Sequence, residues 1–77
     1  MAPLPDPLVT SDAKRLGGTP VFAGTRVPVR LLFEYLATGS SLDDFLHQYP
    51  DVTKIHAAAV IAEAARHVQH AATTAAA

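Results

Sequence analysis

The chain of 77 residues contains no cysteine, so disulfide bonds and thiolate metal sites are excluded. It also lacks an apolar run of the roughly 20 residues that a membrane-spanning helix requires. No basic flank followed by an apolar stretch opens the sequence, so we predict no signal peptide. These absences together predict a protein of the cytoplasm.

An excess of charge of one sign is also missing. Six Lys and Arg residues stand against seven Asp and Glu residues, for a net charge of -1. The charges are nevertheless unevenly placed, because residues 1–30 hold four basic and two acidic residues, whereas residues 31–77 hold two basic and five acidic ones. Such an asymmetry is typical of a weak nucleic-acid surface near the basic end.

Small size is the next constraint on the fold. A chain of this length forms one domain, which buries only about 60% of the surface that the unfolded chain exposes. Domains this small usually need a disulfide, a metal or a partner chain for extra stability. Because disulfides are excluded and 49% of the residues are hydrophobic, we expect a second copy of the chain, forming a homodimer.

Proline and glycine divide the N-terminal part of the chain. Alternating prolines predict an extended tail over residues 1–7, and Leu8–Thr10 could follow as a short strand. The β-prone runs Thr19–Phe22 and Thr25–Val29 flank Ala23-Gly24, which predicts a short hairpin. We predict one domain over residues 8–72, followed by a frayed tail over 73–77.

Three helices are predicted after the hairpin. The first begins at about Pro28 and ends before Gly39. The second is capped by Ser41, with Asp44 in the capping-box position, and ends at Pro50. The third runs over about 54–71 and is capped by Thr53.

The third predicted helix has three different sides at a period of about 100° per residue. One apolar face comprises Ala57, Val60, Ile61, Ala64 and Val68. A polar stripe comprises His56, Glu63, His67 and His70. The remaining side is small and apolar, and we expect it to form the dimer interface together with the hairpin; the interface residues are Ile55, Ala58 and Ala62 with Val21, Phe22 and Val27.

A motif in the hairpin carries a family resemblance. The pattern is Gly-x-Pro, two apolar residues, x-Gly-Thr-Arg, then apolar-Pro-Val, and it spans residues 18–29. An apolar helix, a glycine, a Ser-x-Asp-Asp sequence and the pair Tyr49-Pro50 follow in order, before an Ala-rich helix. In this order of motifs, from about Val9 to Ala65, the chain resembles the family called domain of unknown function 433.

The resemblance implies a fold and a function. The fold would be mainly α, a helix-turn-helix three-helix core with a short N-terminal β-hairpin. Several proteins of the family resemble VapB-type antitoxins that are encoded beside a PIN-like ribonuclease toxin. A protein of this kind would neutralise that toxin by direct binding and would repress its own operon by binding operator DNA.

A helix-turn-helix motif reads base edges with the first residues of its second helix. Thr53, Lys54 and His56 are therefore the candidates for base contacts. The candidates for phosphate contacts are Lys14, Arg15, Arg26 and Arg30. Two other interpretations stay open: the two helices could form only a compact bundle, and Arg26 could hydrogen-bond carbonyl groups or a carboxylate such as Asp43 or Asp44.

Other chemistries are less well supported by the sequence. Gly24-Thr25 lacks the spacing and the lysine of a phosphate-binding loop. Glu63, His67 and His70 could bind a metal from one helix face, but no other element supplies a ligand, and a solvated polar face explains them equally. No histidine has a nucleophile at a recognisable spacing. We therefore expect no metal, no cofactor and no enzymatic activity; the alternative function is a protein-interaction or assembly module without DNA binding.

Overall fold

The computed structural model describes residues 4–14 and 16–71. It contains the strands β1 (Val9–Thr10) and β2 (Val21–Phe22), a 3-10 helix at Leu16–Gly18, and three α-helices. The α-helices are α1 (Val29–Ala37), α2 (Leu42–Gln48) and α3 (Lys54–Ala71). The predicted fold class, mainly helical with a short antiparallel sheet at the N-terminus, is confirmed. Residues 1–3 and the predicted tail over 73–77 lie outside the described residues.

The sheet pairs two strands that come from either side of the 3-10 helix. β1 and β2 are antiparallel, with Val9 opposite Phe22 and Thr10 opposite Val21. The predicted partner of β2, the run from Thr25 to Val29, contributes a single bridge between Val21 and Pro28. Pro28 has no N–H to donate and helix α1 begins immediately after it, so the second half of the predicted hairpin cannot continue as a strand.

Helix α1 begins one residue later than predicted. Pro28 is its N-cap and has extended backbone angles (φ -62°, ψ 133°), so Val29 is the first helical residue. Gly39 follows the end of the helix with a φ of 90°, and its N–H donates to the carbonyl of Leu36. A left-handed residue after the last helical turn is the usual position of glycine, as predicted.

The capping signals predicted for α2 and α3 are both present. The Asp44 N–H donates to Ser41 Oγ at 3.0 Å, and the Ser41 N–H donates to Asp44 Oδ2 at 3.0 Å, which completes the capping box of α2. The bond from the Ser41 N–H lowers the pKa of the Asp44 carboxyl below its usual value. Thr53 Oγ1 accepts from the N–H of His56 at 3.1 Å and caps α3.

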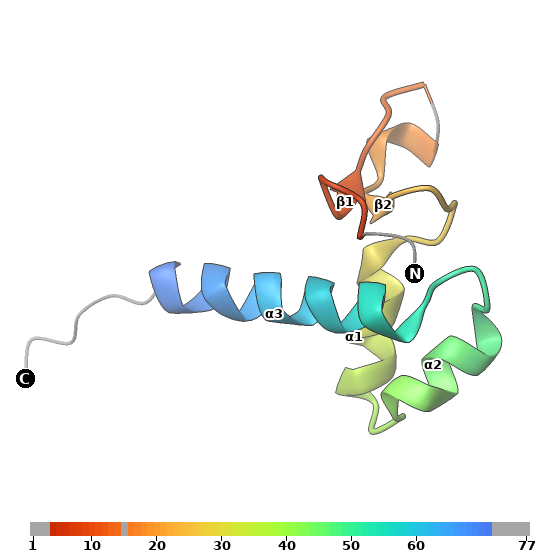
Figure 1. Cartoon of the computed structure of the whole chain (residues 1–77), viewed down its shortest axis with the longest axis vertical. Helices are drawn as coiled ribbons and strands as arrows, with labels where there is room; N and C mark the ends of the chain where they lie inside the picture. Colours follow the sequence, from red (N-terminus) through yellow and green to blue (C-terminus); the bar gives the residue numbers. More distant parts are fainter. Residues whose placement is uncertain (1–3, 15, 72–77) are drawn as a thin grey trace, which may run out of the picture.

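The hydrophobic core lies where the sheet, α1 and α2 meet the N-terminal half of α3. Its buried side chains are Phe22, Val27, Leu32, Phe45, Val52, Ala57 and Val60. Phe45 on α2 is central, because its ring contacts those of Phe22, Tyr35 and Tyr49 at centroid distances of 5.9, 5.6 and 5.0 Å. Figure 1 shows that the C-terminal half of α3 extends away from these elements.

Candidate binding surfaces

The Gly-Thr part of the hairpin motif builds a tight turn after β2. Gly24 has a φ of 78°, a conformation in which other residues are strained. The Thr25 hydroxyl donates to the carbonyl of Phe22 at 2.8 Å and accepts from the N–H of Val27 at 3.0 Å. The Phe22 N–H also donates to the Val27 carbonyl at 3.0 Å. These bonds fix the chain reversal, so Gly24 and Thr25 have structural roles.

Arg26 has no such role among the residues that the structure describes. Its side chain is exposed and forms no hydrogen bond or ion pair with residues 4–14 or 16–71. The predicted partners are engaged elsewhere, because Asp44 belongs to the capping box and Asp43 Oδ1 lies 3.9 Å from Lys54 Nζ. The interpretation of Arg26 as a residue that bonds within the turn is therefore wrong.

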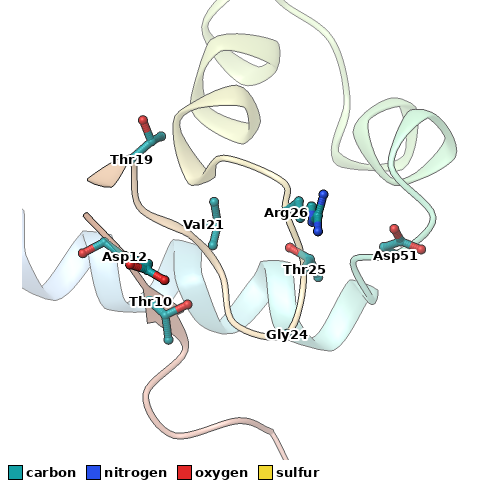
Figure 2. Close-up of a pocket in the computed structure, with 9 residues that line it drawn as sticks. Thr10, Asp12, Thr19, Val21, Gly24, Thr25, Arg26 and Asp51 are labelled. Carbon is teal, nitrogen blue, oxygen red and sulfur yellow. The ribbon is translucent and has the colours of Figure 1, made fainter. Parts of the chain in front are cut away.

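Arg26 instead lies at the edge of a groove of about 890 Å³. Figure 2 shows Thr10 and Asp12 of the N-terminal segment on one side of this groove, and Arg26 and Asp51 on the other. The lining residues are Thr10, Ser11, Asp12, Thr19, Val21, Gly24, Thr25, Arg26 and Asp51. Sequence reasoning did not find this groove, because no local signal brings four separate segments together.

The first turn of α3 has the exposure expected of part of a recognition helix. Thr53 and Lys54 are exposed, and the Lys54 side chain keeps 71% of its surface. Two acidic residues nevertheless lie near this helix start. Asp43 of α2 lies close to the Lys54 amine, and Asp51 precedes α3 in the sequence. They reduce the positive potential that would attract DNA.

His56 is not available for base contacts, contrary to the prediction. It is 6% exposed, and its Nε2 lies 2.8 Å from the carbonyl oxygen of Leu8. A carbonyl can only accept, so Nε2 carries the proton and donates to Leu8. The ring of Phe22 meets the imidazole edge to face at 5.3 Å. His56 therefore holds the N-terminal segment against α3.

Of the remaining basic candidates, the structure describes Lys14 and Arg30. Lys14 is exposed, and its backbone N–H donates to Asp12 Oδ1 at 2.9 Å. Arg30 forms an exposed ion pair with Glu34 at 3.0 Å, one helical turn further along α1. Arg15, predicted to contact phosphates, lies outside the described residues. The Arg30 pair removes one of the free positive charges on which the phosphate-contact prediction depends.

The predicted dimer residues fall into two groups. Phe22 and Val27 are 0% and 9% exposed and belong to the core of the single chain, so their prediction as dimer-interface residues is wrong: they have almost no surface left for a second copy. Val21 is half-buried. On α3, Ala58 and Ala62 are exposed and Ile55 keeps 52% of its surface, so this side of the helix is accessible in the single chain.

The polar stripe of α3 is used for contacts along the helix. Glu63 forms an ion pair with Arg66, and its Oε1 lies 3.4 Å from Nε2 of His67. Within the described part of the chain, no three His, Cys, Asp or Glu side chains are grouped in a way that could hold a metal ion. None of the helices in these residues has both the length and the apolar character needed to cross a membrane.

Comparison with known proteins gives two matches. Residues 9–64 match the family model described as protein of unknown function (DUF433). The chain is also 46% identical over 59 residues to "Uncharacterized protein y4eO" of Sinorhizobium fredii (strain NBRC 101917 / NGR234). The match covers 74% of this chain and 27% of that relative, so the chain spans about a quarter of the relative's length. No solved structure matches the chain significantly.

Proposed function

Because the chain belongs to the DUF433 family, we propose that it is a cytoplasmic antitoxin that neutralises a PIN-like ribonuclease toxin by direct binding. We further propose that it represses its own operon as a homodimer, through the helix-turn-helix unit α2–turn–α3. The resemblance of family members to VapB-type antitoxins supports both parts. Neither part requires a metal, a cofactor or a catalytic group.

The observation that carries the first part is the exposed side of α3. Ile55 retains 52% of its surface, and Ala58 and Ala62 are exposed on the same side of the helix. Small side chains allow another element to approach the helix axis closely, and an exposed isoleucine gives such a contact an apolar anchor. Lys54 and Arg66 lie near this side but are accompanied by Asp43 and Glu63, so the contact that we propose is mainly apolar.

The second part is supported by the local geometry of α2 and α3. A capped helix, a short turn around the buried Val52 and a second capped helix place Thr53 and Lys54 at an exposed helix start. That is the position from which a recognition helix contacts base edges. The nearby Asp43 favours the alternative, a protein-interaction module without DNA binding, because it offsets the charge of Lys54.

Toxin binding is tested with the product of the neighbouring reading frame, which the proposal expects to be a PIN-like ribonuclease. We expect Ala62→Glu to weaken the complex by about 30-fold or more in a calorimetric titration, because truncation or disruption at an interface centre costs about 2 kcal/mol or more. Ala37→Glu introduces the same charge at an exposed position on α1 and should leave binding unchanged. Equal affinities for the two variants would remove α3 from the toxin interface, and wild-type protein that does not bind would end the antitoxin proposal.

Operator binding is tested by mobility shift with the DNA upstream of the gene, over a series of salt concentrations. We expect Lys54→Ala to weaken binding and to reduce the slope of log affinity against log salt by about 1, as the loss of one phosphate contact does. Arg66→Ala, which removes the same charge from the far half of α3, should keep the wild-type slope. If wild-type protein shifts no DNA even at low salt, the alternative without DNA binding stands.

A further inference from the structure

The two-stranded sheet has one face in the core and the other in the groove. Val9 and Phe22 are opposite each other in the sheet, Phe22 within the core and Val9 packed against it. Thr10 and Val21 form the next pair, and successive side chains of a strand point to opposite faces, so these two project from the other face. Both line the groove. The groove therefore lies over the outer face of the sheet.

The lining of the groove is half-buried at its floor and charged only at its rim. The half-buried lining residues are Thr19, Val21 and Thr25. The charged lining residues, all exposed, are Asp12, Arg26 and Asp51. A volume of about 890 Å³ falls within the range of about 300–1,000 Å³ that is typical of ligand sites, so the groove has room for a few peptide residues.

The backbone on both sides of Arg26 is fixed, although its own side chain has no partner. The Thr25 hydroxyl is bonded to the Phe22 carbonyl and to the Val27 N–H, and Val27 is buried in the core. Asp51 lines the same side of the groove, yet no ion pair joins it to Arg26 within the described ranges. A guanidinium presents a fork of N–H donors that matches a carboxylate. Arg26 is therefore positioned to bind a carboxylate of another molecule.

The two aspartates at the rim restrict the charge of the rest of that molecule. Asp51 lies on the same side as Arg26, and Asp12 lies across the groove (Figure 2). The Lys14 N–H donates to Oδ1 of Asp12 and leaves Oδ2 available. A nucleic-acid strand carries a negative charge at every nucleotide, so phosphates beside the one on Arg26 would approach these carboxylates. A ligand with one carboxylate and one cation instead meets a charge of opposite sign on each side.

We propose that the groove binds an extended segment of another protein in which an acidic residue stands next to a basic one. Successive side chains of an extended segment point in opposite directions. The acidic side chain then reaches Arg26, and its basic neighbour reaches Asp12. None of the Asp and Glu residues in this sequence is adjacent to a Lys or Arg, so a second copy of these 77 residues offers no such segment. The site uses no residue of α3 and does not depend on toxin or operator binding.

Selection from an unbiased library of short peptides, on the immobilised full chain, tests the class of ligand. We expect the enriched peptides to share an acidic residue beside a basic one. Asp12→Asn keeps the acceptor for the Lys14 N–H and removes the charge, so selection on this variant should retain the acidic residue and lose the basic neighbour. Peptides enriched without the acidic residue, or no enrichment over an empty surface, would show that the groove does not bind such a segment.

A charge swap tests the role of Arg26 with the best enriched peptide as the probe. We expect Arg26→Glu to weaken binding about tenfold or more in fluorescence polarisation, because a hydrogen-bonded charge pair becomes a like-charge pair. Changing the acidic residue of the peptide to lysine should restore most of the affinity. Arg30→Glu makes the same change on α1 outside the groove and should have no effect on peptide binding. Circular dichroism would check that both variants are folded.

Two competitors distinguish the proposed ligand from other ligands with a negative group. Neither a single-stranded oligonucleotide nor free glutamate should displace the peptide at concentrations at which the unlabelled peptide does so. Displacement by either one that is lost in Arg26→Glu would assign the groove to a nucleic acid or to a small anion and would overturn the proposal. A charge swap that restores no affinity would do so as well. The antitoxin proposal could fail without changing any of these readouts.

Discussion

Replacing Phe45 with alanine should remove a large part of the chain's free energy of unfolding. Phe45 is fully buried, and its ring contacts those of Phe22, Tyr35 and Tyr49, so it joins the sheet, α1 and the turn before α3. Truncation of a buried phenylalanine costs about 3–5 kcal/mol in the free energy of unfolding. A domain of this length has only on the order of 4–12 kcal/mol in total. Circular dichroism during urea unfolding would measure the loss.

Two variants separate loss of packing from a general effect of substitution. Phe45→Leu keeps most of the apolar volume and should fold with a smaller loss of stability. Leu36→Ala removes a large side chain that is 36% exposed and should cost less than Phe45→Ala. All samples should be compared at one protein concentration, because dimer formation would raise the apparent stability. A Phe45→Ala chain with wild-type stability would show that this aromatic cluster does not hold the fold together.

The helix boundaries could be predicted because their signals are local. The side chains of Ser41 and Asp44, three residues apart, each accept from the backbone N–H of the other, and Thr53 caps α3 by accepting from the N–H of His56. The predicted third helix, over about 54–71, coincides with α3 as observed. The error at the start of α1 was one residue, because proline is common both at the cap and at the first helical position.

The sheet partner and the role of His56 could not be predicted in the same way, because both depend on contacts between distant residues. The sequence places two β-prone runs on either side of Ala23-Gly24, and the turn between them does form. The neighbour that β2 acquires is β1, which precedes the 3-10 helix. Similarly, the helical period assigns His56 to a polar stripe, whereas its partner is a carbonyl 48 residues away in the chain.

Adjacent residues of the hairpin motif differ in what the fold explains about them. Gly24 supplies a backbone conformation and Thr25 supplies two hydrogen bonds, so both are explained by the turn. The turn does not explain Arg26. Its side chain has no hydrogen-bond partner among the described residues and lies at the edge of the groove. The sequence left two interpretations of Arg26 open, and within the described residues the structure gives its side chain no hydrogen-bond partner, unlike that of Thr25.

The second large effect is expected at His56. Replacement by alanine should remove the hydrogen bond to Leu8 and leave a space beside Phe22, at a cost of about 2–3 kcal/mol. The Leu8 carbonyl keeps its second bond, from the Ala23 N–H at 2.9 Å, so the greater part of the loss comes from packing. Hydrogen exchange should show faster exchange in β1 and at Ala23, with α2 less affected.

His56→Gln provides the matched control, because its amide can still donate to Leu8 while the aromatic contact with Phe22 is lost. If the hydrogen bond positions the N-terminal segment, the glutamine variant should protect Ala23 better than the alanine variant does, although both lose stability. Equal exchange at Ala23 in the two variants would assign the effect to packing alone. If exchange rises equally in β1 and α2, the N-terminal segment and the helices open together. His56 would then belong to one cooperative core and would not hold a separable N-terminal segment.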